Sequence, residues 1–334
     1  MPSLYDAAIL LAGLVLLMIG GDVMVRGAVG IAERLRLSPM LIGLVVVGLG
    51  TSSPELAASV QAAIAGSPGL AIGNIVGSNV ANLLLVLGSA ALIAPIAVER
   101  NTLWRDGGVG LAASLAFVLA SFTLGLDRIV ATICLIALAV YILYAYRQER
   151  LVPESGPADH TAAFDRAAAS EGLDPALTPH DKPEQSLGKA AVFFVVGLAL
   201  IVGGGTLLVN SAVSIASALG VSEAVIGLTI VAVGTSAPEL VTSVIAAIRG
   251  QSDIALGNVL GSNIYNLLFI GGVTGLTAPS EIPAKIAEFD LPLATLAAFV
   301  VMVFAYTGGR LSRREGAVLV VAYLVYTAFT SGLV

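Results

Sequence analysis

Two glutamates occupy equivalent motifs in a chain that is otherwise mostly apolar. Glu55 lies in Gly-Thr-Ser-Ser-Pro-Glu-Leu and Glu239 in Gly-Thr-Ser-Ala-Pro-Glu-Leu, each about 17 residues into an apolar segment. At ~1.5 Å per helical residue both carboxylates would lie deep in a bilayer, where an ionised acid costs roughly 2.5 to 3.5 kcal/mol. The apolar segments carry no Lys or Arg away from their ends. The simplest missing countercharge is therefore a bound cation.

A proline stands directly before each glutamate. Pro54 and Pro238 lack a backbone N–H and clash with the carbonyl four residues earlier, which belongs to a glycine in both motifs. We therefore expect the helix to open at Gly-Thr-Ser and to release the carbonyls of residues 48–51 and 232–235. Calcium binds six to eight oxygen atoms without strict geometry, so such carbonyls suit it. Hydroxyl groups at the same level belong to Thr51, Ser52, Thr235 and Ser236.

A second motif, Gly-Ser-Asn-x-x-Asn, also occurs in two places. Ser78 and Asn82 are four residues apart and share a helix face, and Ser262 and Asn266 repeat that spacing. We interpret these four side chains as further ligands. The alternative, that they only hydrogen-bond neighbouring helices, stays open. Interhelical hydrogen bonds are the role that we predict for Asn74, Asn79, Asn258 and Asn263.

The glutamates also have a structural alternative, in which burial keeps each acid protonated. An unpaired acid at two equivalent positions would then be a repeated cost with no use, so we favour ligands. Asp22 differs, because it stands four residues before Arg26 and its counterpart in the second half is Thr206. We interpret Asp22 as part of an ion pair.

The composition is typical of a membrane protein. Of 334 residues, 57% are hydrophobic and 11% are charged, against roughly 25% charged in soluble domains. The mean hydropathy is +0.97. A net charge of −6 without a basic patch argues against nucleic acid as a partner. The single cysteine, Cys134, excludes an intrachain disulfide and a thiolate zinc site, and we expect no cofactor.

We expect an all-α integral membrane protein in the lipid bilayer, because the apolar runs do not alternate as barrel strands do. An acidic linker at 148–188, with both histidines and five prolines, would separate a first half, 1–147, from a second, 189–334. A metal-binding or regulatory role for His160 and His180 remains an alternative. Ten spans are predicted, at 4–24, 38–64, 69–95, 106–124, 127–147, 189–212, 222–248, 253–279, 288–307 and 313–332.

The two halves are related by an internal repeat. Residues 43–95 match 227–279 at a constant offset of 184, with 28 of 53 positions identical. Five spans per half make the second half enter the membrane from the opposite side, an inverted repeat with ligand sites expected near the midplane. Lys and Arg gather in the loops after odd-numbered spans, which predicts both termini outside and the linker in the cytoplasm. The first span, without a signal-peptide pattern, is expected to be retained.

In these motifs the sequence resembles the cation/calcium exchanger superfamily, specifically prokaryotic sodium/calcium exchangers with two α-repeats. The resemblance implies ten helices, with spans two, three, seven and eight packed around the cation sites and spans one and six sliding across them. It implies Na⁺/Ca²⁺ exchange, three to one, in a prokaryotic inner or plasma membrane. Calcium would bind Glu55, Glu239 and the carbonyls of Thr51 and Thr235. Sodium would use the same glutamates with Ser52, Ser78, Ser236, Ser262 and the carbonyls of Gly48 and Ala232.

One position departs from relatives that have aspartate where this chain has Asn266. Potassium-dependent relatives use that aspartate, so the resemblance implies exchange without K⁺. Exchange of protons or of another divalent cation is the alternative, followed by a cation channel. An intramembrane hydrolase built on a nucleophile and a base is not expected, because neither histidine lies in a span, so an enzyme is not expected.

Overall fold

The computed structural model describes residues 4–35, 37–151, 186–218 and 232–330, and nearly all of them are helical. The first half contains α1 (Leu4–Leu35), α2 (Pro39–Leu41), η1 (Ile42–Val47), α3 (Gly48–Thr51), α4 (Ser53–Ile64), α5 (Pro68–Val80), η2 (Ala81–Val86), α6 (Leu87–Ile93), β1 (Ile96–Ala97), α7 (Arg100–Thr102), η3 (Leu103–Gly107), α8 (Gly108–Ser121) and α9 (Arg128–Leu151). The second contains α11 (Leu187–Ala218), α13 (Ala232–Thr235), α14 (Ala237–Ile248), α15 (Ser252–Ile264), η6 (Tyr265–Ile270), α16 (Gly271–Thr277), η7 (Ile286–Asp290), α17 (Leu291–Gly308), β2 (Arg310–Leu311) and α18 (Arg313–Thr330).

Several of these helices can cross a membrane. Within the described residues, seven are long and apolar enough, and an eighth span forms if Pro39–Thr51 and Ser53–Ile64 count together. The fold is therefore that of a multi-pass, all-α membrane protein, as predicted. Residues 222–231 of the predicted seventh span and most of the predicted linker, 152–185, lie outside the described residues. Helix α1 continues to Leu35, well past the predicted end of span one at residue 24.

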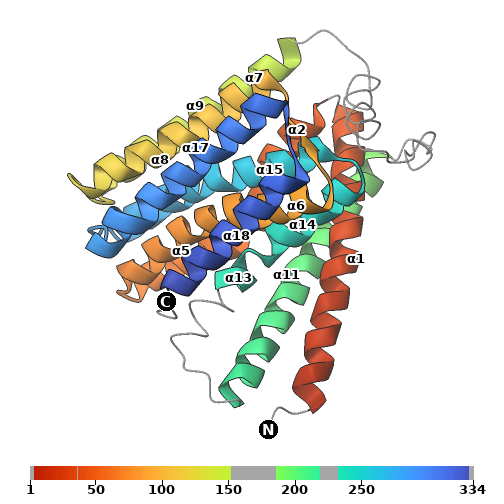
Figure 1. Ribbon diagram of the computed structural model, residues 1–334, viewed down its shortest axis with the longest axis horizontal. Helices are drawn as coiled ribbons and strands as arrows, with labels where there is room; N and C mark the ends of the chain where they lie inside the picture. The colour runs from red at the N-terminus through yellow and green to blue at the C-terminus, as the bar shows by residue number, and fades with distance from the viewer. Residues whose placement is uncertain (1–3, 36, 152–185, 219–231, 331–334) are drawn as a thin grey trace.

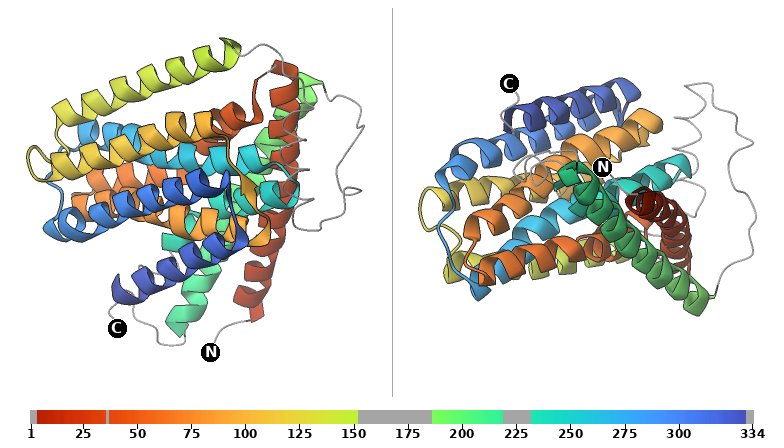
Figure 2. Two further views of the ribbon diagram at one scale, coloured as in Figure 1. Left: turned by 45° about the horizontal axis from the view of Figure 1, so that its top comes forward. Right: turned by 90° about the horizontal axis from the view of Figure 1, so that it is seen from below.

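Two long helices, α1 and α11, cross each other on one side of the bundle (Figures 1 and 2). Glycines line their contact. A Cβ atom on Gly204 would lie 2.8 Å from the carbonyl oxygen of Gly13, and one on Gly20 would lie 2.8 Å from the backbone nitrogen of Ile201. The two helices run antiparallel with their backbones touching, a packing that only small residues permit.

The centre of the bundle is formed by the continuous helices α5–η2–α6 and α15–η6–α16. In their most apolar windows 72% and 83% of the residues are buried, against 28% to 39% in the outer spans. Close backbone contact again depends on glycine, since a Cβ on Gly43 of η1 would lie 2.8 Å from the carbonyl oxygen of Ile254 in α15. The motif segments with the predicted ligands therefore occupy the most buried part of the protein.

Connections at the two ends of the bundle recur within one residue of the offset of the sequence repeat. Strand β1 pairs antiparallel with β2 through Ile96 and Leu311. A second bridge joins Leu126 to Ser280, which lies 184 positions after Ile96. Two buried or half-buried acids recur likewise: Tyr141 donates to Asp106 over 2.8 Å and Tyr326 to Asp290 over 3.0 Å. These contacts extend the likeness of the halves beyond residues 43–95.

The glycine contact between α1 and α11 predicts a difference between two neighbouring substitutions. Gly204→Ala places a methyl group against the α1 backbone, and such overpacking costs about 1–3 kcal/mol. Gly203→Ala meets no heavy atom within 4 Å and gains helix propensity. Thermal unfolding of the purified protein in detergent should show a lower midpoint for Gly204→Ala alone. Equal midpoints for the two variants would contradict this packing.

Candidate cation site

The helix that carries Glu55 is interrupted one turn before it. Ser52, with φ −80° and ψ 4°, separates α3 from α4, and the axes bend by 43°. Pro54 lies in the first turn of α4, where a missing N–H is tolerated. Ser236, with φ −88° and ψ 6°, separates α13 from α14 in the same way. Both predicted interruptions are confirmed, and each falls on the serine of the Gly-Thr-Ser motif.

Some of the predicted carbonyls at the first break stay hydrogen-bonded, and that of Leu49 accepts the Ser53 hydroxyl over 3.1 Å. We expected the Gly48 carbonyl to be released, but it accepts the Ser52 N–H over 3.0 Å, so that prediction is wrong. The reason is that the helix opens after Ser52, not before Thr51. A carbonyl oxygen has two lone pairs, so Gly48 as a cation ligand stays a prediction. Ala232 is the first residue of α13, and its role stays a prediction too.

The two carboxylates lie together in the interior, each facing the other half of the chain. Glu55 is 1% exposed and Glu239 is fully buried. Ser52 donates to Oε1 of Glu239 over 3.2 Å, and Ser236 lies beside Glu55. The two acids are close enough to interact electrostatically. The broken helices thus bring both motifs to one place.

Three of the four oxygen atoms of these carboxylates have no hydrogen-bond partner. Both carboxylate oxygens of Glu55 and Oε2 of Glu239 are buried and accept no hydrogen bond. No Lys or Arg among the described residues pairs with either acid. Buried charges are normally paired or coordinated to a metal, because desolvation otherwise costs several kcal/mol. The geometry therefore fits a cation between the two glutamates.

The other predicted side chains are buried on the two central helices. Asn82 and Asn266 are each 1% exposed, and neither amide has a hydrogen-bond partner. Each is the second residue of a π-helical turn, η2 or η6, a feature common at functional sites. Ser78 and Ser262 are also buried, and Ser262 lies next to Glu239. The structure thus offers no hydrogen bond from Asn82 or Asn266 to a neighbouring helix, which favours ligands over interhelical contacts.

The threonines of the motifs are placed differently from each other. Thr51 is fully buried, and its hydroxyl lies 3.0 Å from Oδ1 of Asn258 and 3.1 Å from the Val47 carbonyl oxygen. It therefore ties α3 to α15. Thr235 is half-buried at the end of α13. The predicted carbonyl ligands of both threonines stand directly before the two helix breaks.

An asparagine on each central helix bonds both the backbone of a glutamate and a serine, and only the asparagines were predicted. Nδ2 of Asn74 donates to Ser59 Oγ over 2.9 Å and to the Glu55 carbonyl over 3.3 Å. Nδ2 of Asn258 donates to Ser243 Oγ over 2.8 Å and to the Glu239 carbonyl over 3.2 Å. The interhelical bonds of the asparagines were expected, whereas the serines were missed. Their signal is in the sequence, since each serine follows its glutamate by four residues in both halves.

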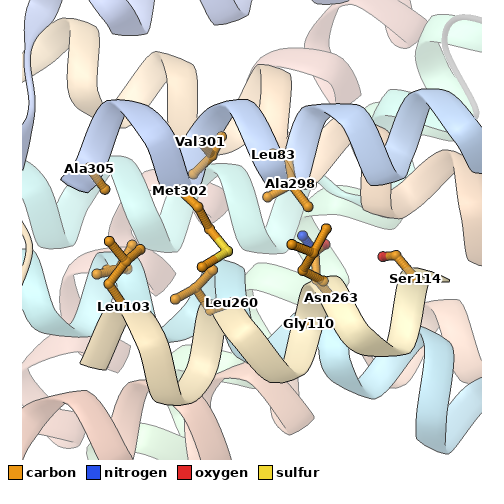
Figure 3. A pocket seen from close by; sticks show the side chains of 13 residues that line it. Leu83, Leu103, Gly110, Ser114, Leu260, Asn263, Ala298, Val301, Met302 and Ala305 are labelled. Atoms are coloured by element: carbon orange, nitrogen blue, oxygen red, sulfur yellow. The ribbon is translucent and has the colours of Figure 1, made fainter. Parts of the chain in front are cut away.

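Asn79 and Asn263 follow Ser78 and Ser262 in the chain and connect the two central helices. Asn79 donates to the Asn263 carbonyl over 3.3 Å, which confirms the predicted interhelical bond. The Asn263 side chain lines a small cavity with Ser114 and apolar residues such as Met302 (Figure 3). That cavity contains no carboxylate, so it is no candidate for a cation.

The chemistry of the donor atoms limits which cations this site can bind. No cluster of three or more His, Cys, Asp or Glu side chains occurs in the part of the chain that the structure describes. The donors are two carboxylates with hydroxyl, amide and carbonyl oxygens, and such oxygen sets suit hard ions such as Ca²⁺ rather than zinc or copper.

Comparison with known proteins agrees with this site. A family model described as "Sodium/calcium exchanger protein" matches residues 5–148 and again 189–332. The chain belongs to the sodium/calcium exchanger family. Putative antiporter CaxA of Alkalimonas amylolytica is 38% identical over 323 residues, 95% of each chain. Sodium/calcium exchanger MaX1 of Methanosarcina acetivorans is 34% identical over 338 residues, 95% of this chain and 96% of the other.

Solved structures give the same family. The sodium-calcium exchanger NCX_Mj, soaked with 2.5 mM Na⁺ and 0.1 mM Ca²⁺, superposes with a TM-score of 0.80. It has 29% sequence identity, and the match covers 98% of this chain and 99% of that one. The two matches of the family model coincide with the halves on either side of the predicted linker. This chain is thus a membrane antiporter of the exchanger family.

The hydrogen bonds of Asn258 predict an indirect effect on cation binding. Asn258→Ala should leave the glutamate in place but free its backbone, and groups that orient metal ligands typically change affinity by about 10–100-fold. We expect radiolabelled Ca²⁺ to bind the purified variant at least about tenfold more weakly than the parent. Thr295→Ala is the control, because the Thr295 hydroxyl bonds only the Leu291 carbonyl of its own helix. An unchanged Ca²⁺ affinity in Asn258→Ala would show that Asn258 does not position Glu239 for binding.

Proposed function

We propose that the protein exchanges Na⁺ for Ca²⁺ across the membrane by alternating access. The observation that carries this proposal is the pair Glu55 and Glu239, buried side by side with three carboxylate oxygens unsatisfied. The exchanger family and its named relatives support Na⁺ and Ca²⁺ as the ions. The transported ions are substrates and not resident cofactors.

Competition for the carboxylates makes the exchange obligatory. Two carboxylates can neutralise one Ca²⁺ or a group of Na⁺ ions, but they cannot hold both loads together. An occupied site can close against apolar surface because its charge is balanced. An empty pair of carboxylates is too costly to seal from water. Only loaded states therefore cross between the two open conformations.

For the topology we propose ten spans in two inverted repeats of five. The recurrence of motifs and helix breaks at an offset of 184, and of end contacts within one residue of it, supports two equivalent halves. An odd number of spans per half supports their inversion. We further propose that both termini lie outside and that residues 148–188 face the cytoplasm of a prokaryote.

For the coupling we propose three Na⁺ per Ca²⁺ without K⁺. Asn82 and Asn266 are both neutral, so the site has two formal negative charges. One Ca²⁺ balances them, and three Na⁺ exceed them by one positive charge. Each cycle then moves one net charge. Exchange driven by protons would instead have the two glutamates take up and release H⁺, and the sodium/calcium exchangers among the relatives favour Na⁺.

Reconstitution tests the function directly. Liposomes loaded with Na⁺ should accumulate radiolabelled Ca²⁺ when diluted into Na⁺-free choline medium, with or without K⁺. Glu55→Gln and Glu239→Gln should each abolish uptake while the protein stays monodisperse, because each variant removes half of the site's charge. The control Glu33→Gln changes an exposed glutamate and should retain uptake. Ca²⁺ uptake that is independent of the Na⁺ gradient, or full activity in either site variant, would contradict the proposal.

The stoichiometry predicts a response to voltage. Ca²⁺ uptake against three Na⁺ exports one positive charge per cycle, so an inside-positive potential should favour accumulation. One charge is worth ~2.3 kcal/mol per 100 mV, so about 60 mV should raise the equilibrium Ca²⁺ ratio about tenfold. Liposomes clamped with valinomycin and K⁺ gradients measure this ratio. A ratio independent of potential would indicate two Na⁺ per Ca²⁺.

A further inference from the structure

The crossed pair α1 and α11 meets the rest of the bundle at α14. A Cβ atom on Gly21 of α1 would lie 2.8 Å from Cγ1 of Val241 and 3.2 Å from Cγ1 of Ile245, both in α14. Figure 1 shows α14 beside the upper half of α1. α14 is also the helix that begins with the Glu239 motif. Contact between α1 and α14 therefore links the outer pair to the cation site.

An ion pair crosses this junction one residue from Gly21. Asp22 of α1 accepts from Arg26 of its own helix over 2.8 Å, and its other carboxylate oxygen pairs with the Arg249 guanidinium. Arg249 caps the C-terminal end of α14, directly before the left-handed Gly250. The Asp22 and Arg249 side chains are 33% and 28% exposed, so water screens the pair only partly. The sequence predicted the partner Arg26 and missed Arg249.

The equivalent junction in the other half cannot form such a pair. The offset of 184 places Thr206 opposite Asp22 and Ala65 opposite Arg249. The Thr206 hydroxyl bonds the Val202 carbonyl of its own helix, and alanine has no polar side chain. The predicted side-chain ligands, in contrast, are of the same type in both halves. They pair as Thr51 and Thr235, Ser52 and Ser236, Glu55 and Glu239, Ser78 and Ser262, and Asn82 and Asn266.

We propose that the Asp22–Arg249 ion pair is a one-sided latch that favours the conformation seen here over the alternative open state. This rests on the proposed alternating access, in which equivalent halves exchange conformations. If the ligands are alike in both halves, they bind ions alike in both open states and create little preference between them. A contact made in one state alone shifts the equilibrium by its own free energy. The latch is such a contact, and the Thr206–Ala65 junction has no ion pair that could stabilise the other state to the same extent.

Distance measurements between spin labels test the latch in the full chain. Cysteines replace Tyr5 on α1 and Leu324 on α18, which are 73% and 60% exposed, in a Cys134→Ala background. The parent should show a dominant distance and a minor second one at a fixed Na⁺ concentration. Asp22→Asn and Arg249→Gln should each raise the second population about two- to fivefold, the effect expected of a partly exposed pair.

Two matched variants separate the latch from general effects. Arg26→Gln removes only the bond within α1 and should leave the populations near those of the parent. Arg249→Lys keeps the charge and should do the same. Unchanged distances in both Asp22→Asn and Arg249→Gln, or an equal shift in Arg26→Gln, would overturn the latch. Failure of the proposed function would be seen separately, as absence of Na⁺-driven Ca²⁺ uptake in the spin-labelled parent.

Discussion

Two buried carboxylates without a basic partner are the constraint on which the rest of this structure depends. Glu55 and Glu239 would be too costly to bury alone, and the described helices contain no Lys or Arg that reaches them. The proposed cation would supply the charge that balances them, and the neighbouring features fit that role. The helix breaks at Ser52 and Ser236 interrupt the backbone at the same level, and Asn74 and Asn258 fix the backbone of each glutamate.

Duplication explains how a single chain builds this site. Each half supplies one broken helix and one polar central helix, and each glutamate lies beside a serine of the other half. Neither half therefore makes the site alone. Differences between the halves are then informative, because selection for cation binding alone would leave them equal. The ion pair of Asp22 with Arg249 is such a difference, and it lies where the crossed pair α1 and α11 meets α14.

The site could be predicted from sequence because its signal is local and repeated. A buried acid stands out in a chain with 11% charged residues, and the proline before it marks the helix break. Contacts between distant segments could not be predicted. Ser59 reaches Asn74, and Arg249 reaches Asp22, only because of how the helices cross. A hydropathy pattern marks only the part of a helix that crosses the apolar membrane. The predicted first span therefore ended at residue 24, whereas α1 continues to Leu35. The Gly48 carbonyl stays bonded because the break falls one turn later.

Competition between the two ions for one pair of carboxylates is the central claim, and equilibrium binding tests it most directly. Radiolabelled Ca²⁺ is titrated onto the purified protein at several Na⁺ concentrations. The account predicts one Ca²⁺ per chain, with Na⁺ weakening its affinity without reducing the number of sites. The affinity should fall with a power of the Na⁺ concentration above one, since several Na⁺ replace one Ca²⁺. Calcium binding that is independent of Na⁺, or simultaneous binding of both full loads, would contradict the account.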